Sequence, residues 1–362
     1  MIIFNSLCSK TVKVKGVPKL RIIDPLAYEG WDELVLSTED VGIFYTSMWA
    51  RVLRDSYGFT PLYLSSIEDG EIRLLMPLME VRSPITGKRA VSIPFTDRCD
   101  TIFTEQGHFD EAFETAKNLG KKRGWRYIEW RGGAGFKEEA PPSETFFEHV
   151  LDLDRPPDKV FASFRESNRR NIKKAMKAGL EVKLENSLES LAQYYRLHCK
   201  TRREHGLPPQ PFSFFRNLHR HIISAGHGFT ALCLQDSVAI AGAVFLHFGS
   251  QAIYKYGASE KEHQHLRPNN LIMWEAIRHY CDKGFKTLSL GRTELENHGL
   301  LQFKQGWGAL ESILKYHKFD LARNVFVSNS DSRLTGWHNK VFRSCPIPVL
   351  RLIGSLLYRH IA

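Results

Sequence analysis

The sequence predicts an α/β protein made of two similar lobes and a helical tail. The first observation is an internal repeat: Gly58-Phe-Thr-Pro-Leu-Tyr-Leu64 reappears as Gly228-Phe-Thr-Ala-Leu-Cys-Leu234, and a polar turn and a second strand follow in both places. The second is length, because 362 residues, of which 43% are hydrophobic, suffice for about two domains with sizeable cores.

The elements that follow each hairpin also recur in the same order. A predicted helix at 110–122 leads into a strand at 124–130, and a predicted helix at 271–283 leads into a strand at 284–290. Chance could produce the letters Gly-Phe-Thr, but the ordered recurrence of four elements favours a duplication. We therefore expect two lobes, each with a mixed sheet flanked by helices.

The lobe boundary is predicted from segments rich in glycine and proline. Gly132-Gly-Ala-Gly135 and Glu138-Glu-Ala-Pro-Pro142 have no apolar period, which is typical of a connection. We assign residues 1–144 to the first lobe, 145–322 to the second, and 323–362 to a tail that packs on the first lobe or on a membrane surface.

The second lobe opens with a predicted strand at 146–153 and a helix at 157–179. One face of this helix is basic and is interrupted by a single acidic residue, Glu166. A solvated surface and a binding surface for an anionic partner stay equal alternatives. The cations are Arg165, Arg169, Arg170, Lys173, Lys174 and Lys177, of which Arg169 and Arg170 are candidates for substrate binding.

A further helix is predicted to end near Gly206, where the following prolines force an extended segment. This helix carries Arg202, a candidate for substrate binding. His198 and His205 have no Asp or Cys partner at an obvious spacing, so we interpret both as structural or surface residues.

The densest polar stretch runs from Gly291 to Gly308 and follows a short apolar run at 287–290. It combines four glycines with Arg292, Glu294, Lys304 and other charged residues, and it is too polar for a core. Because α/β proteins place their chemistry in loops at strand ends, we expect a loop that forms the site.

Composition excludes several classes of protein. The six cysteines are scattered without a CxxC pair, so neither a disulfide framework nor a zinc site is expected. Residues 1–10 lack the order of a signal peptide and no apolar run approaches the roughly 20 residues of a membrane span, which predicts a cytoplasmic protein. The formal net charge of +10 favours acidic partners.

Hydrolase, metalloprotease, Walker and dinucleotide motifs are absent from the sequence. A transferase with a large anionic donor is therefore the class of enzyme that the sequence favours.

Several motifs together resemble the FemAB-like proteins of the GNAT superfamily, most closely the branch associated with exosortase and polysaccharide loci. The resemblance runs from about Phe44 to Gly308. The motifs are Phe44-Tyr-Thr-Ser-Met-Trp49, Pro94-Phe-Thr-Asp97, Ser167-Asn-Arg-Arg-Asn-Ile-Lys-Lys-Ala-Met-Lys-Ala-Gly179, Tyr254-Lys-Tyr-Gly-Ala-Ser259, Arg267-Pro-Asn-Asn-Leu271, Gly291-Arg-Thr293 and Phe303-Lys-Gln-Gly-Trp-Gly308.

The resemblance implies tandem GNAT folds and an acyltransferase of the aminoacyltransferase or N-acetyltransferase kind. It makes Phe303 and Lys304 part of an active-site channel, where the lysine stabilises charge on the acyl group. Asp97 lies where related proteins keep polar groups that bind the acceptor, and it could instead take up the proton of the attacking amine.

The remaining candidates for substrate binding are Arg292, Tyr256 and Asn269. A strand tyrosine and a helix-capping asparagine explain Tyr256 and Asn269 almost as well. Lys304 has a structural alternative too, as a salt-bridged loop lysine.

We expect transfer of an acyl group to an amine on a sugar, peptide or lipid-linked precursor of the cell envelope or of a polysaccharide. No tightly bound cofactor is expected; the donor is aminoacyl-tRNA, acyl carrier protein or acyl-CoA. The chain lacks the Gln/Arg-x-x-Gly-x-Gly/Ala loop with which GNAT enzymes bind the CoA pyrophosphate, which counts against acetyl-CoA. The alternative is a non-catalytic or nucleic-acid-binding protein, including one that binds tRNA, using the basic helix at 165–177.

The tail at 337–362 combines an apolar stripe with basic flanks. Such a helix docks on its own protein or lies on a membrane surface. If the acceptor is lipid-linked, peripheral contact with the inner face of the membrane follows.

Overall fold

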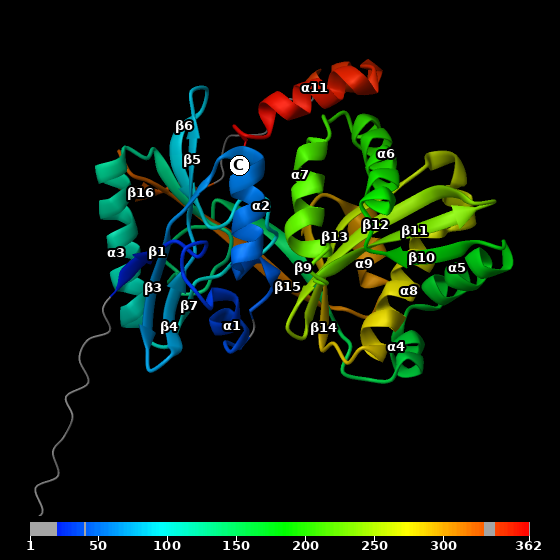
Figure 1. Ribbon diagram of the computed structural model, residues 1–362, viewed down its shortest axis with the longest axis horizontal. Coiled ribbons are helices and arrows are strands. Elements are labelled where there is room, and N and C mark those ends of the chain that lie inside the picture. Colours follow the sequence, from blue (N-terminus) through cyan, green and yellow to red (C-terminus); the bar gives the residue numbers. More distant parts are fainter. Residues whose placement is uncertain (1–19, 40, 329–336, 362) are drawn as a thin grey trace, which may run out of the picture.

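One long sheet runs through both lobes of the protein (Figure 1). A computed structural model describes residues 20–39, 41–328 and 337–361; residues 1–19 of the first lobe and 329–336 of the tail lie outside that part. In the described part the sheet has 12 strands, in the order β10-β11-β12-β13-β14-β9-β15-β8-β6-β5-β2, with β16 on β15. Their bounds are β2 Thr60–Pro61, β5 Met79–Ser83, β6 Gly87–Val91, β8 Tyr127–Trp130, β9 Glu144–Asp152, β10 Glu181–Glu185, β11 Gly228–Gln235, β12 Val238–Phe248, β13 Gln251–Ser259, β14 Thr287–Glu294, β15 Leu310–Asp320 and β16 Val325–Phe326.

The strand order is symmetric about the pair of β9 and β15, which run antiparallel at its centre. The next strand on each side is antiparallel to its central neighbour: β14 pairs with β9, and β8 pairs with β15. The strand after that is parallel to the one it pairs with: β13 to β14, and β6 to β8. Parallel neighbours need a helical crossover, which α8 (Pro268–Asp282) and α3 (Gln106–Arg123) supply. The duplication predicted from the sequence is therefore present in the fold, and the α/β tandem-lobe class is confirmed.

The two expected sheets are joined edge to edge rather than separate. Strand β15, assigned to the second lobe by sequence, pairs with β9 through its first half and with β8 of the first lobe through its second half. The first lobe also has a separate 4-stranded sheet in the order β1-β3-β4-β7. Its strands are β1 Arg21–Ile23, β3 Tyr63–Glu68, β4 Glu71–Met76 and β7 Ile102–Phe103.

The smaller sheet arises because the first-lobe hairpin is broken where the second-lobe hairpin is continuous. Pro61 and Pro77 cannot donate to a ladder, and the chain is bridged there by Leu62 N donating to Leu78 O at 2.8 Å. Strands β2 and β5 thus stay in the long sheet, while β3 and β4 turn away from it.

Helices between the lobes give them a shared core. Trp49 and Tyr57 of α2 pack on Phe214 of α7, with ring centroids 6.2 and 5.7 Å apart. Figure 1 shows both helices between the blue-to-cyan first lobe and the green-to-yellow second lobe. The remaining helices of the lobes are α1 Trp31–Leu36, α2 Ser47–Tyr57, α4 Pro157–Ser163, α5 Glu166–Lys177, α6 Leu188–Glu204, α7 Phe212–Leu218 and α9 His298–Gln305, with short turns at Ile43–Tyr45, His219–Ile223 and Lys261–Leu266.

Two sequence predictions need correction. The helix expected at 157–179 is two helices, α4 and α5, because Phe164 and Arg165 are extended and Arg165 N donates to Gly306 O at 3.0 Å. The stretch at 291–308 is not one loop: β14 continues to Glu294, and Asn297 caps helix α9, accepting from Leu300 N at 3.2 Å. Phe303 and Lys304 therefore lie on a helix.

The tail forms α10 (Trp337–Ser344) and α11 (Ile347–Leu357), and α11 docks on the protein. In Figure 1 the red α11 lies across the ends of α6 and α7. Leu350, Gly354 and Tyr358 are buried, and a Cβ at Gly354 would meet Pro209 O at 2.0 Å. Among the described residues, no helix has the length and apolar character needed to cross a bilayer.

Candidate active site

A cavity of about 640 Å³ lies between the lobes, over the ends of β9, β13 and β14. Its walls come from both halves of the chain, so neither lobe alone could form it. Four carboxylates and one guanidinium line it, which makes it acidic in a protein with a net charge of +10. The charged lining residues are Glu39, Asp97, Arg98, Asp100 and Glu148.

Asp97 is held in this wall by a strained turn. Ile93 and Phe95, just before it, have φ of 49° and 61°, values that L residues rarely adopt and that cluster at functional sites. The turn is secured where Thr96 Oγ1 donates to Ile93 O at 2.7 Å and where the Tyr316 hydroxyl donates to Asp97 O.

Asp97 forms a partly buried ion pair with Lys255 of β13, whose Nζ donates to Asp97 Oδ2 at 2.8 Å. Burial acts to raise the pKa of Asp97, but Lys255, with Arg292 and Lys304 near by, outweighs it and holds the pKa below its usual range. A carboxylate of lowered pKa is a weak base, so proton uptake by Asp97 is disfavoured while binding of a cationic acceptor is not.

Lys304 is almost fully buried, with 2% of its surface exposed. Its Nζ donates to the carbonyl oxygens of Gly291 and Arg292 at 2.8 and 2.9 Å, where the pairing of β14 with β9 shifts register. Burial lowers the pKa of Lys304 to about 8, against the opposing pull of the carboxylates Asp97, Glu294 and Glu148. Backbone carbonyls, not the salt bridge considered as its structural alternative, are its hydrogen-bond partners.

Arg292 lies next to this lysine on β14, and its guanidinium stacks on two aromatic rings. It is 4.3 Å from the centroid of Phe146 and 5.2 Å from that of Tyr316. Burial acts to lower the pKa of Arg292, but Tyr316 and Asp97 raise it above its usual value. Arg292 thus adds fixed positive charge beside Asp97.

Glu148 of β9 faces the same cavity and is 4% exposed. Its Oε2 accepts from Arg98 Nη1 at 2.9 Å, and Arg98 Nε donates to Asp100. Burial raises the pKa of Glu148, opposed by Arg98 and reinforced by Asp100 and Asp97. The cavity therefore contains two carboxylates with opposite pKa shifts.

Three further candidates do not line the cavity and are held in packing or caps. Phe303 of α9 packs edge-on against Trp307 with centroids 5.7 Å apart. Tyr256 packs on Phe215, and its buried hydroxyl has no hydrogen-bond partner among the described residues. Asn269, in the first turn of α8, donates from Nδ2 to Ser259 Oγ at 3.2 Å.

The arginine candidates lie apart from the cavity. Arg202 Nη2 donates to the Tyr358 hydroxyl at 3.1 Å, which ties α6 to the tail. Arg169 and Arg170 lie on α5, and Arg170 pairs with Glu166 at 3.1 Å with both side chains more than two thirds exposed. These residues do not line the cavity, so any substrate contact they make would be with a large partner.

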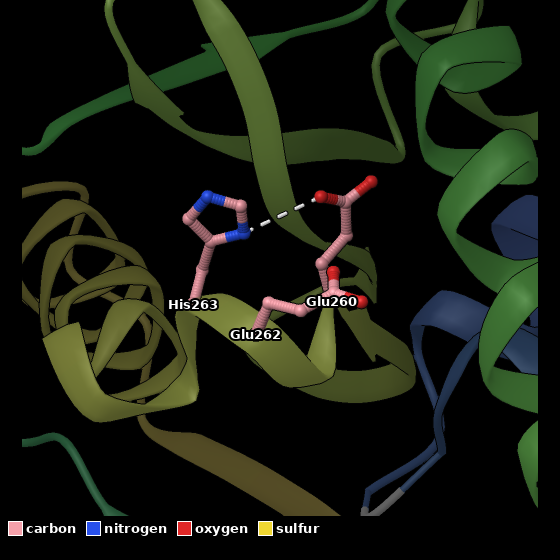
Figure 2. A group of neighbouring side chains, drawn as sticks. All are labelled: Glu260, Glu262 and His263. Carbon is pink, nitrogen blue, oxygen red and sulfur yellow. Dashed lines mark ion pairs between the residues drawn. The ribbon is translucent and has the colours of Figure 1, made fainter.

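Carboxylates and a histidine gather at a second place, between β13 and α8, where Figure 2 shows Glu260, Glu262 and His263 turned toward one another. Glu260 already forms ion pairs with Lys200 and His263. A group neutralised by a lysine is a poor cation site, because a metal would have to displace the ammonium.

Sequence reasoning missed Lys255, Arg98 and Glu148. Lys255 is part of Tyr254-Lys-Tyr256, and Arg98 follows Asp97 directly. Glu148 did carry a signal: in a strand it shares a face with the apolar residues Phe146 and Val150, where a charged side chain is unexpected.

Comparison with known proteins identifies the class. Residues 162–305 match the acetyltransferase (GNAT) domain family, a range that extends from α4 to α9. The solved structure of FemX aligns with a TM-score of 0.65 at 16% identity, covering 82% of this chain and 96% of that one. A tandem GNAT protein from the clavulanic acid biosynthesis pathway aligns with a TM-score of 0.54 at 11% identity, covering 86% and 99%. The fold is thus a tandem GNAT fold.

Sequence relatives agree with the resemblance to FemAB-like proteins that the motifs carry. A lipid II:glycine glycyltransferase of Staphylococcus haemolyticus is 21% identical over 285 residues, which is 59% of this chain and 66% of that protein. The enzyme of the same name from Staphylococcus aureus strain USA300 is 30% identical over 95 residues, 25% of this chain and 22% of that protein. The alignment thus spans just under two thirds of the first relative's length.

Proposed function

We propose that this protein is an acyltransferase that moves an activated aminoacyl or other acyl group onto an amine of a cell-envelope or polysaccharide precursor. The observation that carries the proposal is the acidic cavity between the lobes, whose carboxylates suit the ammonium of an acceptor. Relatives named as glycyltransferases acting on lipid II support the same class of reaction.

The candidate residues suit distinct parts of acyl transfer. Attack of an amine on an acyl carbonyl builds negative charge on its oxygen, which fixed positive charge stabilises. For Lys304 we propose this role; two of its three donors bind backbone carbonyls, so the third remains for the oxyanion. Asp97 binds the acceptor, and Phe303 shapes the channel.

For the donor, the exposed basic face of α5 favours an aminoacyl-tRNA. Arg170, Lys173, Lys174 and Lys177 are exposed there, as contact with phosphates requires. A diphosphate at the N-terminus of α8 is disfavoured, because Glu260 and Glu262 lie just before that helix (Figure 2). This weighs against acyl-CoA and leaves acyl carrier protein as the second choice.

Transfer of label tests the proposal. The protein is incubated with aminoacyl-tRNA, acyl-CoA or acyl carrier protein, each with a labelled acyl group, and with amine acceptors including lipid-linked precursors. We expect labelled amide from at least one donor and none from Lys304→Met. If the protein neither binds any of the three donors nor transfers label from them, the proposed acyltransferase function is refuted.

The alternative is a nucleic-acid-binding protein without catalytic activity. The same exposed basic face of α5 would bind the nucleic acid. Sequence-independent binding to phosphates weakens steeply with salt, on the order of 10³-fold or more between low and moderate salt for many contacts. Competition separates the two: a donor site prefers charged over uncharged tRNA, whereas a plain RNA-binding face binds both equally.

We also propose peripheral contact of α11 with an anionic membrane. Leu352 and Leu356 are each 61% exposed on the face that does not dock, although Leu350 of the same helix is buried. Residues 337–362 contain no acidic side chain, and each cation near an anionic surface adds about 1 kcal/mol of attraction. The exposed cations are Lys340, Arg343, Arg351 and Arg359.

Co-sedimentation with vesicles of phosphatidylglycerol and phosphatidylcholine tests this contact. Changing Leu352 and Leu356 to Ser should reduce binding, and added salt should do the same. Val238→Ser, at a hairpin residue that is 53% exposed, is the matched control and should bind like the unchanged protein. Equal binding by all three proteins would show that α11 does not contact lipid.

A further inference from the structure

The carboxylates of Asp97 and Glu148 both line the cavity between the lobes, but they have different charged neighbours. Asp97 accepts from Lys255 and has Arg292 and Lys304 near by, so its negative charge is already balanced. Among the described residues, Glu148 forms an ion pair with Arg98 alone, and the Arg98 side chain is 54% exposed and is shared with Asp100. The negative charge around Glu148 is therefore less fully balanced.

The oxygens of Glu148 are also used unequally. Oε2 accepts from Arg98, whereas Oε1 accepts no hydrogen bond from any residue that the structure describes. Glu148 lies directly opposite Arg292 on β14 and Ser312 on β15, in the centre of the long sheet, which fixes the backbone that carries it. A carboxylate with one anchored and one unpaired oxygen on a rigid strand is placed to accept a proton.

We propose that Glu148 is the general base of the transferase: its Oε1 binds the ammonium of the acceptor in the inter-lobe cavity and removes one proton from it. The inference rests on the proposed acyltransferase function and reassigns proton uptake from Asp97 to Glu148. Arg98 acts as a positioning residue, which holds Oε2 and turns Oε1 toward the cavity.

The proton balance of the step is complete. One ammonium proton moves to Glu148, and the free amine attacks the carbonyl carbon of the donor, an acyl ester or thioester, to form the C–N bond. The bond from that carbon to the leaving oxygen or sulfur breaks, and a second proton passes from nitrogen to the leaving atom. Glu148 returns its proton to water at the end of the turnover.

The groups facing Glu148 shift its pKa in the direction that suits a base. Burial raises its pKa, Asp100 and Asp97 add to the rise, and Arg98 limits it. Lys304 is near enough for Glu148 to raise its pKa, and Arg292 lies opposite on β14. A base of raised pKa is better matched to an ammonium than one of lowered pKa.

The first test is binding, which needs no knowledge of the donor. Binding of n-butylammonium to the full chain is measured by NMR titration for the unchanged protein, Glu148→Gln and Glu144→Gln. Glu144 is on the same strand and exposed, so it is the matched control. We expect at least tenfold weaker binding with Glu148→Gln and no change with Glu144→Gln. Equal binding by all three overturns the proposal, even if transfer activity is found.

The second test is the pH profile of transfer. General bases contribute about 10²- to 10⁴-fold, so Glu148→Gln should lower kcat/KM by at least 100-fold at pH 7. Its rate should then rise about tenfold per pH unit toward the pKa of the acceptor amine, while Glu148→Asp recovers part of the loss. A loss that is equal at every pH would overturn the proposal. Absence of transfer by the unchanged protein, with n-butylammonium still bound through Glu148, would instead refute the proposed function.

Discussion

Replacing Lys304 by Met should change the stability of the protein in a way that depends on pH. The ammonium is buried and bonded to two backbone carbonyls, and burial lowers its pKa from 10.5 to about 8. In the unfolded chain the lysine is solvated and keeps its proton to higher pH. Between pH 8 and 10.5 the unfolded state therefore binds more protons at this residue than the folded state does.

The sign and size follow from this difference. Stability rises with pH wherever the unfolded state binds more protons, so the unchanged protein should gain stability relative to Lys304→Met as the pH rises. The lowering from 10.5 to about 8 is 2.5 pKa units, which at 1.36 kcal/mol per unit gives about 3 kcal/mol over the whole window. From pH 7 to pH 10 we expect most of it, about 2 to 3 kcal/mol.

Guanidinium unfolding at pH 7, 8, 9 and 10 measures the effect as the difference in free energy of unfolding between the two proteins. Titrating groups that do not interact with Lys304 contribute equally to both proteins and cancel. Lys183→Met, at an exposed residue of edge strand β10, is the control and should give a flat difference. A flat difference for Lys304→Met as well would show that folding does not lower the pKa of this lysine.

Three further predictions concern stability at neutral pH, each read from the midpoint of denaturant unfolding. Asp97→Asn leaves the buried ammonium of Lys255 without its ion-pair partner and should destabilise by about 3 to 5 kcal/mol, and a change below 1 kcal/mol would mean that the ammonium is solvated. Trp307→Ala removes a fully buried ring and should cost about 3 to 5 kcal/mol, whereas a neutral result would contradict the packing on Phe164. Gly354→Ala adds a Cβ that would lie 2.0 Å from a backbone oxygen, so it should cost about 1 to 3 kcal/mol and expose the tail to protease; unchanged cleavage would show that α11 is not docked there.

The repeated hairpins and crossovers were predictable because they depend on local patterns. Period-two strands, helical stripes and the Gly58 and Gly228 motifs recur in the sequence and in the fold. The joining of the two sheets was not predictable. It depends on the pairing of β15 with β8, two strands that are far apart in the chain. The break between α4 and α5 was missed because it is set by a tertiary hydrogen bond from Arg165 to Gly306.

The candidate site was predicted in part. Asp97, Lys304 and Arg292 were named from motifs, and the structure brings them near one another. Their partner Lys255 could not be predicted, because the contact joins the two lobes and no local spacing encodes it. Arg202 was named as a candidate for substrate binding, but its Nη2 donates to the Tyr358 hydroxyl of the tail. The catalytic and binding roles themselves stay predictions.

The central pair of β9 and β15 sets a constraint on how the chain acquires its shape during synthesis. The first lobe cannot complete its sheet when its own residues leave the ribosome, because β8 must wait for β15, which is made near the end of the second lobe. Until then β8 presents an unpaired edge, and β9 does too, and such edges pair readily with other chains. A nascent chain that stops before residue 310 should therefore aggregate, whereas completion of β15 closes both lobes in one step.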